Sequence, residues 1–431
     1  MNKQHQMEAV MIAKIINADE KKVKIEFEYN IQSSFLNTEE SIQEALNEAG
    51  KIATEYVLSL NDTDGNPINV GNGRLTSKGK STKKYQTPYG EVQVSRHVYQ
   101  NSQGGKTYCP LDESCRIIVG STPKFAKTVS SKYSEFGGKR VQADLQNNHG
   151  RFISHNYAQD ISNAVGAILE NREKLWTYAP PEEIEDVAFI GIGLDGTCIY
   201  ISNDGYRETM VGTISFYDVV GNRLSTIYTA AAPEYGKSEF FSRFKREISK
   251  YKKLYPRSDI IGIADGAKEN WTFLDQFTRT FVLDFYHVSE YVNDAAKAIF
   301  QKEERRKSWV EKELHKLKHD DGAQSLLLSE LKKHAEKKLG KNKLAKINKA
   351  ITYFDNHLSM MDYANYRRKM YPIGSGVTES ACKTIVKQRL SSSGMKWKKQ
   401  GAATVLCLRA LNYSSGRWNQ FWKKIGQYGI S

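Results

Sequence analysis

Several features of secreted and membrane proteins are missing from this chain of 431 residues. No apolar run approaches the roughly 20 residues that a membrane-spanning helix needs, and the N-terminus has no signal-peptide pattern. Cysteines are few, odd in number and scattered without a CxxC pair, as expected of reduced thiols in the cytosol. They are Cys109, Cys115, Cys198, Cys382 and Cys407. These absences predict a cytoplasmic protein that does not enter a membrane.

Acidic residues are scarce in the last third of the chain. Residues 371–431 hold ten lysines and arginines but one acidic residue. Residues 301–431 carry 28 basic against 11 acidic residues, a net charge of +17, whereas residues 1–300 carry 35 against 38, a net charge of −3. Solvated helix faces explain part of this excess, but ordinary surfaces mix their signs. The distribution favours a polyanionic partner such as nucleic acid.

A hydrophobic content of 39% and an aromatic content of 11% indicate a folded chain, long enough for two or three domains. Residues 1–120 are expected to form an N-terminal α+β region. The pattern predicts a strand at 23–29, a helix from about 38 to 60, a mobile basic loop at 73–84 and a β-hairpin at 85–99.

Residues 121–180 switch to helical spacing and form a second predicted region. A helix around 141–146, a turn at 147–150 and a second helix capped by Ser154 suggest a helix-turn-helix that binds DNA. Two helices packed in an ordinary helical domain explain the same pattern equally well, so both interpretations stay open. The proline-containing, acidic segment 178–186 is a predicted domain boundary.

From residue 187 the pattern becomes α/β. It predicts strands at 188–194, 198–202, 210–219, 223–230, 259–264 and 280–283, and helices at 237–254 and around Trp271. Antiparallel strands followed by a crossover helix and a further strand give a ribonuclease-H-like order. The predicted catalytic core comprises residues 187–285 and 371–395, interrupted by a helical insertion at 286–370. Residues 396–431 are expected to form a basic C-terminal tail.

Three acidic residues lie in settings that suit catalysis. Asp195 and Asp265 each follow a short apolar run and precede a glycine, and Glu379 follows a glycine-rich turn at the start of a helical pattern. Each alone is more often a turn or cap residue. Carboxylates brought together repel one another unless a cation neutralises them, and oxygen ligands suit hard divalent metals. The trio therefore predicts a metal site that acts on a phosphodiester without a nucleophilic side chain.

Four segments carry a resemblance to a known family: LDGT at 194–197, GIADGAKENW at 262–271, LDFYHVSEY at 283–291 and YPIGSGVTESACK at 371–383. They look like the conserved blocks of bacterial insertion-sequence transposases of the DDE type, most closely the ISKra-type family. The stretch TPYGEVQVSRHVYQ, followed by CPLD at 109–112, resembles that family's upstream region less specifically. Many relatives have a cysteine pair near the CPLD block. This chain has only Cys109 and Cys115 there, which do not form a CxxC pair, so a zinc-stabilised N-terminal module is not expected.

The resemblance implies that Asp195, Asp265 and Glu379 are the catalytic and metal-binding acids of a DDE-type DNA transposase. The cofactor would be Mg²⁺, with Mn²⁺ as a substitute, and the site of action the nucleoid of a bacterial cell. The protein would bind the terminal repeats of its element, cut the strands and join the freed 3′-hydroxyl to target DNA. A homo-oligomer would form on the paired ends. A metal-dependent nuclease without strand transfer, and a transposase-derived DNA-binding protein without catalysis, are the alternatives.

Three further residues are candidates for supporting the active site. Asp284 and His287 form a D-x-x-H block, and the resemblance implies that they lie beside the catalytic acids. His287 would then position a phosphate or a carboxylate, or be a buried structural histidine. Lys268, like Asn270, either reaches a DNA phosphate or simply starts a helix.

Basic residues around the last acid are candidates for DNA binding. Three lysines surround a tryptophan, a mixture suited to phosphate contact and base stacking, although a solvated amphipathic face would look the same. The candidates are Lys383, Lys387, Arg389, Lys396, Trp397, Lys398 and Lys399. Gly374 and Gly376 either permit close backbone approach near the metals or form an ordinary turn.

Overall fold

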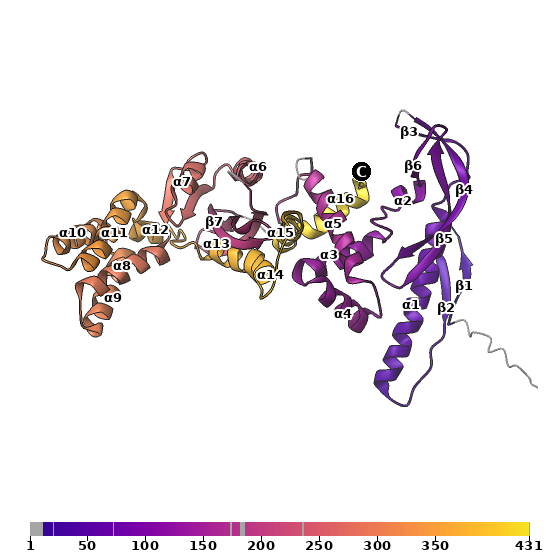
Figure 1. The fold of residues 1–431 in the computed structure, drawn as a ribbon, viewed down its shortest axis with the longest axis horizontal. Helices are drawn as coiled ribbons and strands as arrows, with labels where there is room; N and C mark the ends of the chain where they lie inside the picture. The colour runs from indigo at the N-terminus through magenta and orange to yellow at the C-terminus, as the bar shows by residue number, and fades with distance from the viewer. Residues whose placement is uncertain are drawn as a thin grey trace, which may run out of the picture. The chain divides into compact units, whose positions relative to one another are not determined.

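The computed structural model describes residues 12–19, 21–71, 73–172, 175–181, 186–234 and 237–430 (Figure 1). The chain forms two compact units, which we call the first unit (residues 1–177 and 419–431) and the second unit (178–418). The division falls where the proline-containing segment begins. None of the described helices is long and apolar enough to cross a membrane.

The first unit begins with α+β structure. A two-stranded sheet precedes a long helix, whose first turn is capped by the Ser34 hydroxyl, and a four-stranded antiparallel sheet follows. The predicted strand at 23–29, the long helix and the hairpin are confirmed. The elements are β1 (Ala13–Ala18), β2 (Val23–Phe27), α1 (Phe35–Leu60), β3 (Ile68–Val70), β4 (Gly73–Gln86), β5 (Glu91–Asn101), β6 (Gly104–Tyr108) and α2 (Pro110–Ser114).

Residues 73–84 form most of β4, so the prediction of a mobile loop was wrong. The strand pairs antiparallel with β5 over most of its length. A composition rich in glycine, serine and lysine is typical of loops, but strand formation depends on the pairing partner more than on composition. Lys83 and Lys84 are held by Asp112 and Glu91, at 2.8 and 2.7 Å.

Three helices follow in the first unit: α3 (Pro123–Glu135), α4 (Gly138–His149) and α5 (His155–Arg172). The predicted helix pair is confirmed as α4 and α5. Gly150 ends α4 in the left-handed conformation, at φ +59°, which glycine adopts without strain. The Ser154 hydroxyl accepts the amide hydrogen of Tyr157, as expected of a cap.

The second unit is built on a five-stranded sheet with the order β11-β10-β7-β8-β9. The strand β8 is antiparallel to both its neighbours, whereas β10 runs parallel to both β7 and β11. The strands at 259–264 and 280–283 match their predicted bounds. The elements are β7 (Phe189–Ile201), β8 (Gly205–Tyr217), β9 (Arg223–Ala231), α6 (Ser238–Leu254), β10 (Asp259–Ala264), α7 (Lys268–Leu274) and β11 (Thr280–Leu283).

The two short strands predicted at 188–194 and 198–202 are one continuous strand, β7. Its pairing with β8 is unbroken from Phe189 to Ile201, and it includes Asp195 opposite Val211. Asp195 therefore lies in the middle of a strand and not at its end. The glycine that follows it suggested a turn, but a long antiparallel partner keeps such a residue extended.

The predicted helical insertion is confirmed, and it packs as part of the second unit. Its buried side chains belong to the same hydrophobic core as those of the sheet. The hydroxyls of Tyr363 and Tyr366 donate to the carbonyl oxygens of Leu283 and Phe281 on β11, at 2.9 and 3.0 Å. The elements are α8 (Phe285–Ile299), α9 (Glu303–His319), α10 (Ala323–Ala335), α11 (Lys341–His357), η1 (Leu358–Met360) and α12 (Tyr363–Arg368).

The chain after the insertion is helical, so the expected basic tail is instead ordered helix. The buried Arg409 guanidinium donates to the carbonyl oxygens of Thr384 and Ile385 in the π-helical turn at Cys382–Lys387. Arg409 is 1% exposed, which shows how firmly α15 is packed against this turn. The elements are α13 (Gly376–Ala381), η2 (the π-helical turn Cys382–Lys387), α14 (Gln388–Leu390), α15 (Lys399–Tyr413) and α16 (Arg417–Tyr428).

The helix α13 is docked on the sheet through a pair of threonines and a glycine. The buried hydroxyls of Thr213 and Thr378 lie 2.7 Å apart. A Cβ on Gly193 would overlap the Thr378 hydroxyl and lie 2.9 Å from that of Thr213. The absence of a side chain at Gly193 therefore allows α13, and Glu379 with it, to approach β7.

We expect Gly193→Ala to destabilise the protein by about 1–3 kcal/mol, because overpacking of a tight core contact costs that much. The denaturant midpoint, followed by circular dichroism, measures the loss. Gly376→Ala is the matched control, since a Cβ there meets no atom within 4 Å. Equal midpoints for Gly193→Ala and wild type would contradict the docking role.

Candidate functional site

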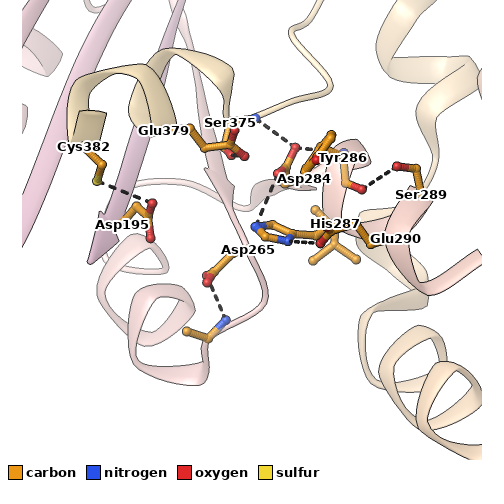
Figure 2. Close-up of polar contacts among 12 residues, drawn as sticks. Asp195, Asp265, Asp284, Tyr286, His287, Ser289, Glu290, Ser375, Glu379 and Cys382 are labelled. Atoms are coloured by element: carbon orange, nitrogen blue, oxygen red, sulfur yellow. Dashed lines mark hydrogen bonds and ion pairs between the residues drawn. The ribbon is translucent and has the colours of Figure 1, made fainter. Parts of the chain in front are cut away.

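Asp195 is held on β7 by two hydrogen bonds. Its Oδ1 accepts the amide hydrogen of Gly196 at 2.7 Å, and its Oδ2 lies 3.5 Å from the Cys382 sulfur of η2 (Figure 2). Burial and the negative charge of Asp265 raise the pKa of Asp195. Burial and Asp195 likewise raise the pKa of the Cys382 thiol, so the thiol stays protonated and donates to the carboxylate.

Asp265 lies in the loop that follows β10. Its Oδ1 accepts from the Ala267 amide at 3.2 Å and from the Asn270 side chain at 3.3 Å. The Tyr353 hydroxyl, from α11 of the insertion, donates to its backbone carbonyl at 2.8 Å. Gly266 has a φ of +103°, and a Cβ there would press on the Tyr353 ring at 3.0 Å. The insertion thus fixes the loop that carries Asp265.

Asn270 and Lys268 were each expected either to reach a DNA phosphate or to start a helix. Lys268 is exposed at the first position of α7, so the helix start is confirmed, and a phosphate contact stays a prediction. Asn270 is 5% exposed and bonded to Asp265, so a phosphate contact is wrong for it. It is a positioning residue.

Asp284 is a wholly buried carboxylate at the start of α8. Its Oδ1 caps the helix by accepting the Tyr286 amide hydrogen, and it also accepts that of Ser375, both at 3.1 Å. Its Oδ2 is buried and accepts no hydrogen bond from the described residues. A Cβ on Gly374 would lie 3.4 Å from Oδ1, an ordinary van der Waals contact, and one on Gly376 would meet no atom within 4 Å, so neither position needs glycine for a close backbone approach.

Glu379 projects from α13 toward Asp284. Ser375 donates its hydroxyl to Glu379 Oε1 at 3.1 Å. Burial raises the pKa of Glu379, and so does the contact with the Asp284 carboxylate, because two neighbouring carboxylates resist ionising together.

His287 lies one helical turn after Asp284. Its Nδ1 is 3.1 Å from Glu290 Oε2, and its Nε2 is 3.8 Å from Asp284 Oδ2. Burial alone would lower the pKa of His287. The hydrogen bond to Glu290 and the charges of Asp284, Asp265 and Glu290 outweigh burial, so the pKa is raised.

The predicted acids and His287 gather around one space: Asp195, Asp265, Asp284, His287 and Glu379 (Figure 2). Asp195 and Asp265 interact electrostatically, and Asp265 also acts on His287. Among the described residues, however, the group whose ligand atoms lie close enough to share one ion is a different one: one atom from each of Asp284, His287 and Glu379 lies within 4.8 Å of the other two, and Asp195, Asp265 and Glu379 form no such group. The structure thus places Asp284 and His287 beside Glu379, whereas the sequence interpretation grouped Glu379 with the two other acids.

Cys382 and Tyr353 are site residues that sequence reasoning missed. Cys382 follows Glu379 by three positions, a spacing that places both on one helix face, and this was the available signal. Tyr353 comes from the insertion and has no local signal. Both act by holding a catalytic candidate in place.

The residues expected to bind DNA divide into two groups. Arg389 is 3% exposed and lies 4.9 Å over the Trp397 ring, so its predicted contact with DNA is wrong. The sequence shows that Arg389 is charged but does not show that the folded chain buries its side chain. The Trp397 indole is half-buried and donates to the Leu390 carbonyl at 3.1 Å, so the ring has a structural role, and base stacking on it stays a prediction. The exposed candidates are Lys383, Lys387, Lys396, Lys398 and Lys399.

Comparisons with known proteins do not place the chain in a family. No protein-family model matches it, and neither does any curated protein. The interpretation of its function therefore rests on the sequence blocks and on the geometry described above.

We expect Asp195→Asn to raise the thermal midpoint at neutral pH in buffer that contains a chelator. A carboxyl group with a raised pKa in the folded state favours folding while protonated, and this stability is lost as pH rises from near 3.8 through the raised value. Because the side-chain amide of the Asp195→Asn variant cannot ionise, the variant does not lose this stability as the pH rises. The difference in thermal midpoint between variant and wild type should vanish below the ordinary pKa of Asp195, near 3.8.

Asp294→Asn, at an exposed position on α8, is the control for this measurement. Its midpoint should follow that of the wild type across the pH range. A neutral-pH midpoint for Asp195→Asn at or below that of the wild type would show that the buried charge carries no cost.

Proposed function

We propose that this protein is a DDE-type DNA transposase with a ribonuclease-H-like core. The order of the five strands, with β8 alone running against the others, supports that fold. The sequence blocks around Asp195, Asp265 and Glu379 support the family. The observation that carries the function is the gathering of these acids from β7, the loop after β10, and α13 around one space (Figure 2).

The donor set fits a divalent cation. Carboxylates are crowded together, the pKa values of Asp195 and Glu379 are raised, and a buried oxygen of Asp284 has no hydrogen-bond donor among the described residues. A cation would relieve this repulsion. Asp195, Asp265 and Glu379 would hold Mg²⁺, or Mn²⁺ in its place. Bound there, the metal would activate water or a 3′-hydroxyl and stabilise the leaving oxygen.

The residues of the chain itself preorganise this site. Gly196 and Cys382 fix the two oxygens of Asp195, Asn270 and the Ala267 amide orient Asp265, and Ser375 orients Glu379. Ligands held in advance need little reorganisation when the phosphodiester arrives. Hydrolysis would free a 3′-hydroxyl at the end of the element, and that hydroxyl would attack a target phosphodiester.

DNA would be bound by both units. Exposed lysines on η2 and at the start of α15 would supply phosphate contacts, and helices α4 and α5 of the first unit are the proposed readers of the terminal repeats. Cutting and joining two ends together would require a homo-oligomer on the paired ends. The protein would act at the bacterial nucleoid.

We expect Asp195→Ala, Asp265→Ala and Glu379→Ala each to abolish Mg²⁺-dependent strand cleavage while binding of the element's ends persists. Cleavage is measured on labelled end fragments, and binding by mobility shift. Asp294→Ala removes an exposed acid of α8 and should cleave like the wild type. Normal cleavage by any of the three variants would remove that residue from the site, and no cleavage by the wild type would favour a DNA-binding protein without catalysis.

We expect replacement of Lys396, Lys398 and Lys399 by alanine to weaken DNA binding and to flatten its salt dependence. Three lost phosphate contacts should reduce the slope of log K against log salt by about 2.7, at about 0.9 per contact. The control removes three exposed lysines of the insertion: Lys338, Lys341 and Lys346. Equal slopes of log K against log salt for the two triple variants would mean that the predicted lysines do not contact phosphates specifically and contribute only through the net charge of the protein.

A further inference from the structure

The Asp284 carboxylate has an oxygen whose environment lacks what a buried anion needs. Asp284 is 0% exposed, and its Oδ1 accepts two amide hydrogens. Its Oδ2 is buried without a hydrogen-bond donor among the described residues, and the nearest basic atom, His287 Nε2, is 3.8 Å away. An unpaired buried anionic oxygen is costly, so either a proton shared with the neighbouring Glu379 carboxyl or a cationic ligand must complete this position.

His287 is oriented as a ligand by Glu290. The Glu290 carboxylate lies 3.1 Å from Nδ1, so a neutral His287 would carry its hydrogen on Nδ1 and leave the Nε2 lone pair on the side of Asp284, 3.8 Å away. A carboxylate that fixes the tautomer of a histidine from behind is the common arrangement around metal-binding histidines. The separation of 3.8 Å is too long for a hydrogen bond. It fits two ligands of one ion, which lie at most about 4.2 Å apart at ordinary bond lengths.

We propose that Asp284, His287 and Glu379 form a binding site for a divalent transition-metal ion. One ligand atom from each already lies within 4.8 Å of the other two. Asp284 and His287 lie at the start of α8, Glu379 lies on α13, and the three side chains point toward one another (Figure 2).

The imidazole distinguishes this site from one that prefers Mg²⁺. Mg²⁺ selects oxygen ligands, whereas a mixed set of one imidazole and two carboxylates suits Mn²⁺, Co²⁺ or Zn²⁺. The site shares Glu379 with the proposed catalytic trio. This inference goes beyond the proposed function, and metal binding at these three residues does not require DNA cleavage.

Co²⁺ is the probe, because its visible absorption reports coordination directly. Full-length protein carrying Asp195→Asn and Asp265→Asn is stripped with a chelator and titrated with Co²⁺. We expect one tightly bound Co²⁺ per chain. Adding His287→Ala should weaken binding by more than the roughly 10- to 100-fold that loss of a supporting partner costs, and Glu290→Ala should fall within that range.

His315→Ala is the matched control, since His315 is exposed on α9 and stacks on His319. It should leave the tight Co²⁺ site unchanged, and circular dichroism should show each variant folded. Equal affinity with and without His287, or loss of the tight site in His315→Ala, would overturn the proposal. Absence of any tight Co²⁺ would also overturn it, and would mean that Asp284 and Glu379 share a proton. Because the titrated variant lacks two catalytic candidates, its result is independent of strand cleavage.

Discussion

Mutual repulsion among the carboxylates beside β7 and β10 is the constraint on which the rest of the second unit depends. Asp195, Asp265, Asp284 and Glu379 come from separate parts of the chain, and the fold gathers them although burial raises the pKa of two of them. Such a cluster persists only where the surrounding structure holds it in place. The cost in stability is consistent with a site kept for chemistry.

Contacts made by residues far apart in sequence hold this cluster of carboxylates together. Gly193 lets α13 approach β7, Arg409 donates to carbonyl oxygens of the π-helical turn, and Tyr353 holds the loop of Asp265 from within the insertion. The insertion is therefore not a passive interruption. It lies in the same hydrophobic core as the sheet and sets the position of a catalytic candidate.

Local pattern predicted most strands and helices, because short apolar runs bounded by glycine or polar residues identify buried strands. Local pattern failed where pairing with a neighbouring strand determines the conformation. Pairing with β8 keeps Asp195 within β7, and pairing with β5 makes residues 73–84 a strand. Cys382 meets Asp195 across 187 positions of sequence: its spacing from Glu379 placed the two on one helix face, but only the fold brings that face against Asp195. Arg389 was misassigned because charge counts say nothing of burial.

The central claim is that this carboxylate site cuts and joins DNA strands. Its most direct test supplies purified protein and Mg²⁺ with the DNA that flanks its gene, together with pre-cut ends bearing a free 3′-hydroxyl, and maps all products by sequencing. We predict cuts at the element's ends and covalent joining of the 3′-hydroxyl to target DNA. Cleavage without any joined product would contradict the account and indicate a metal-dependent nuclease.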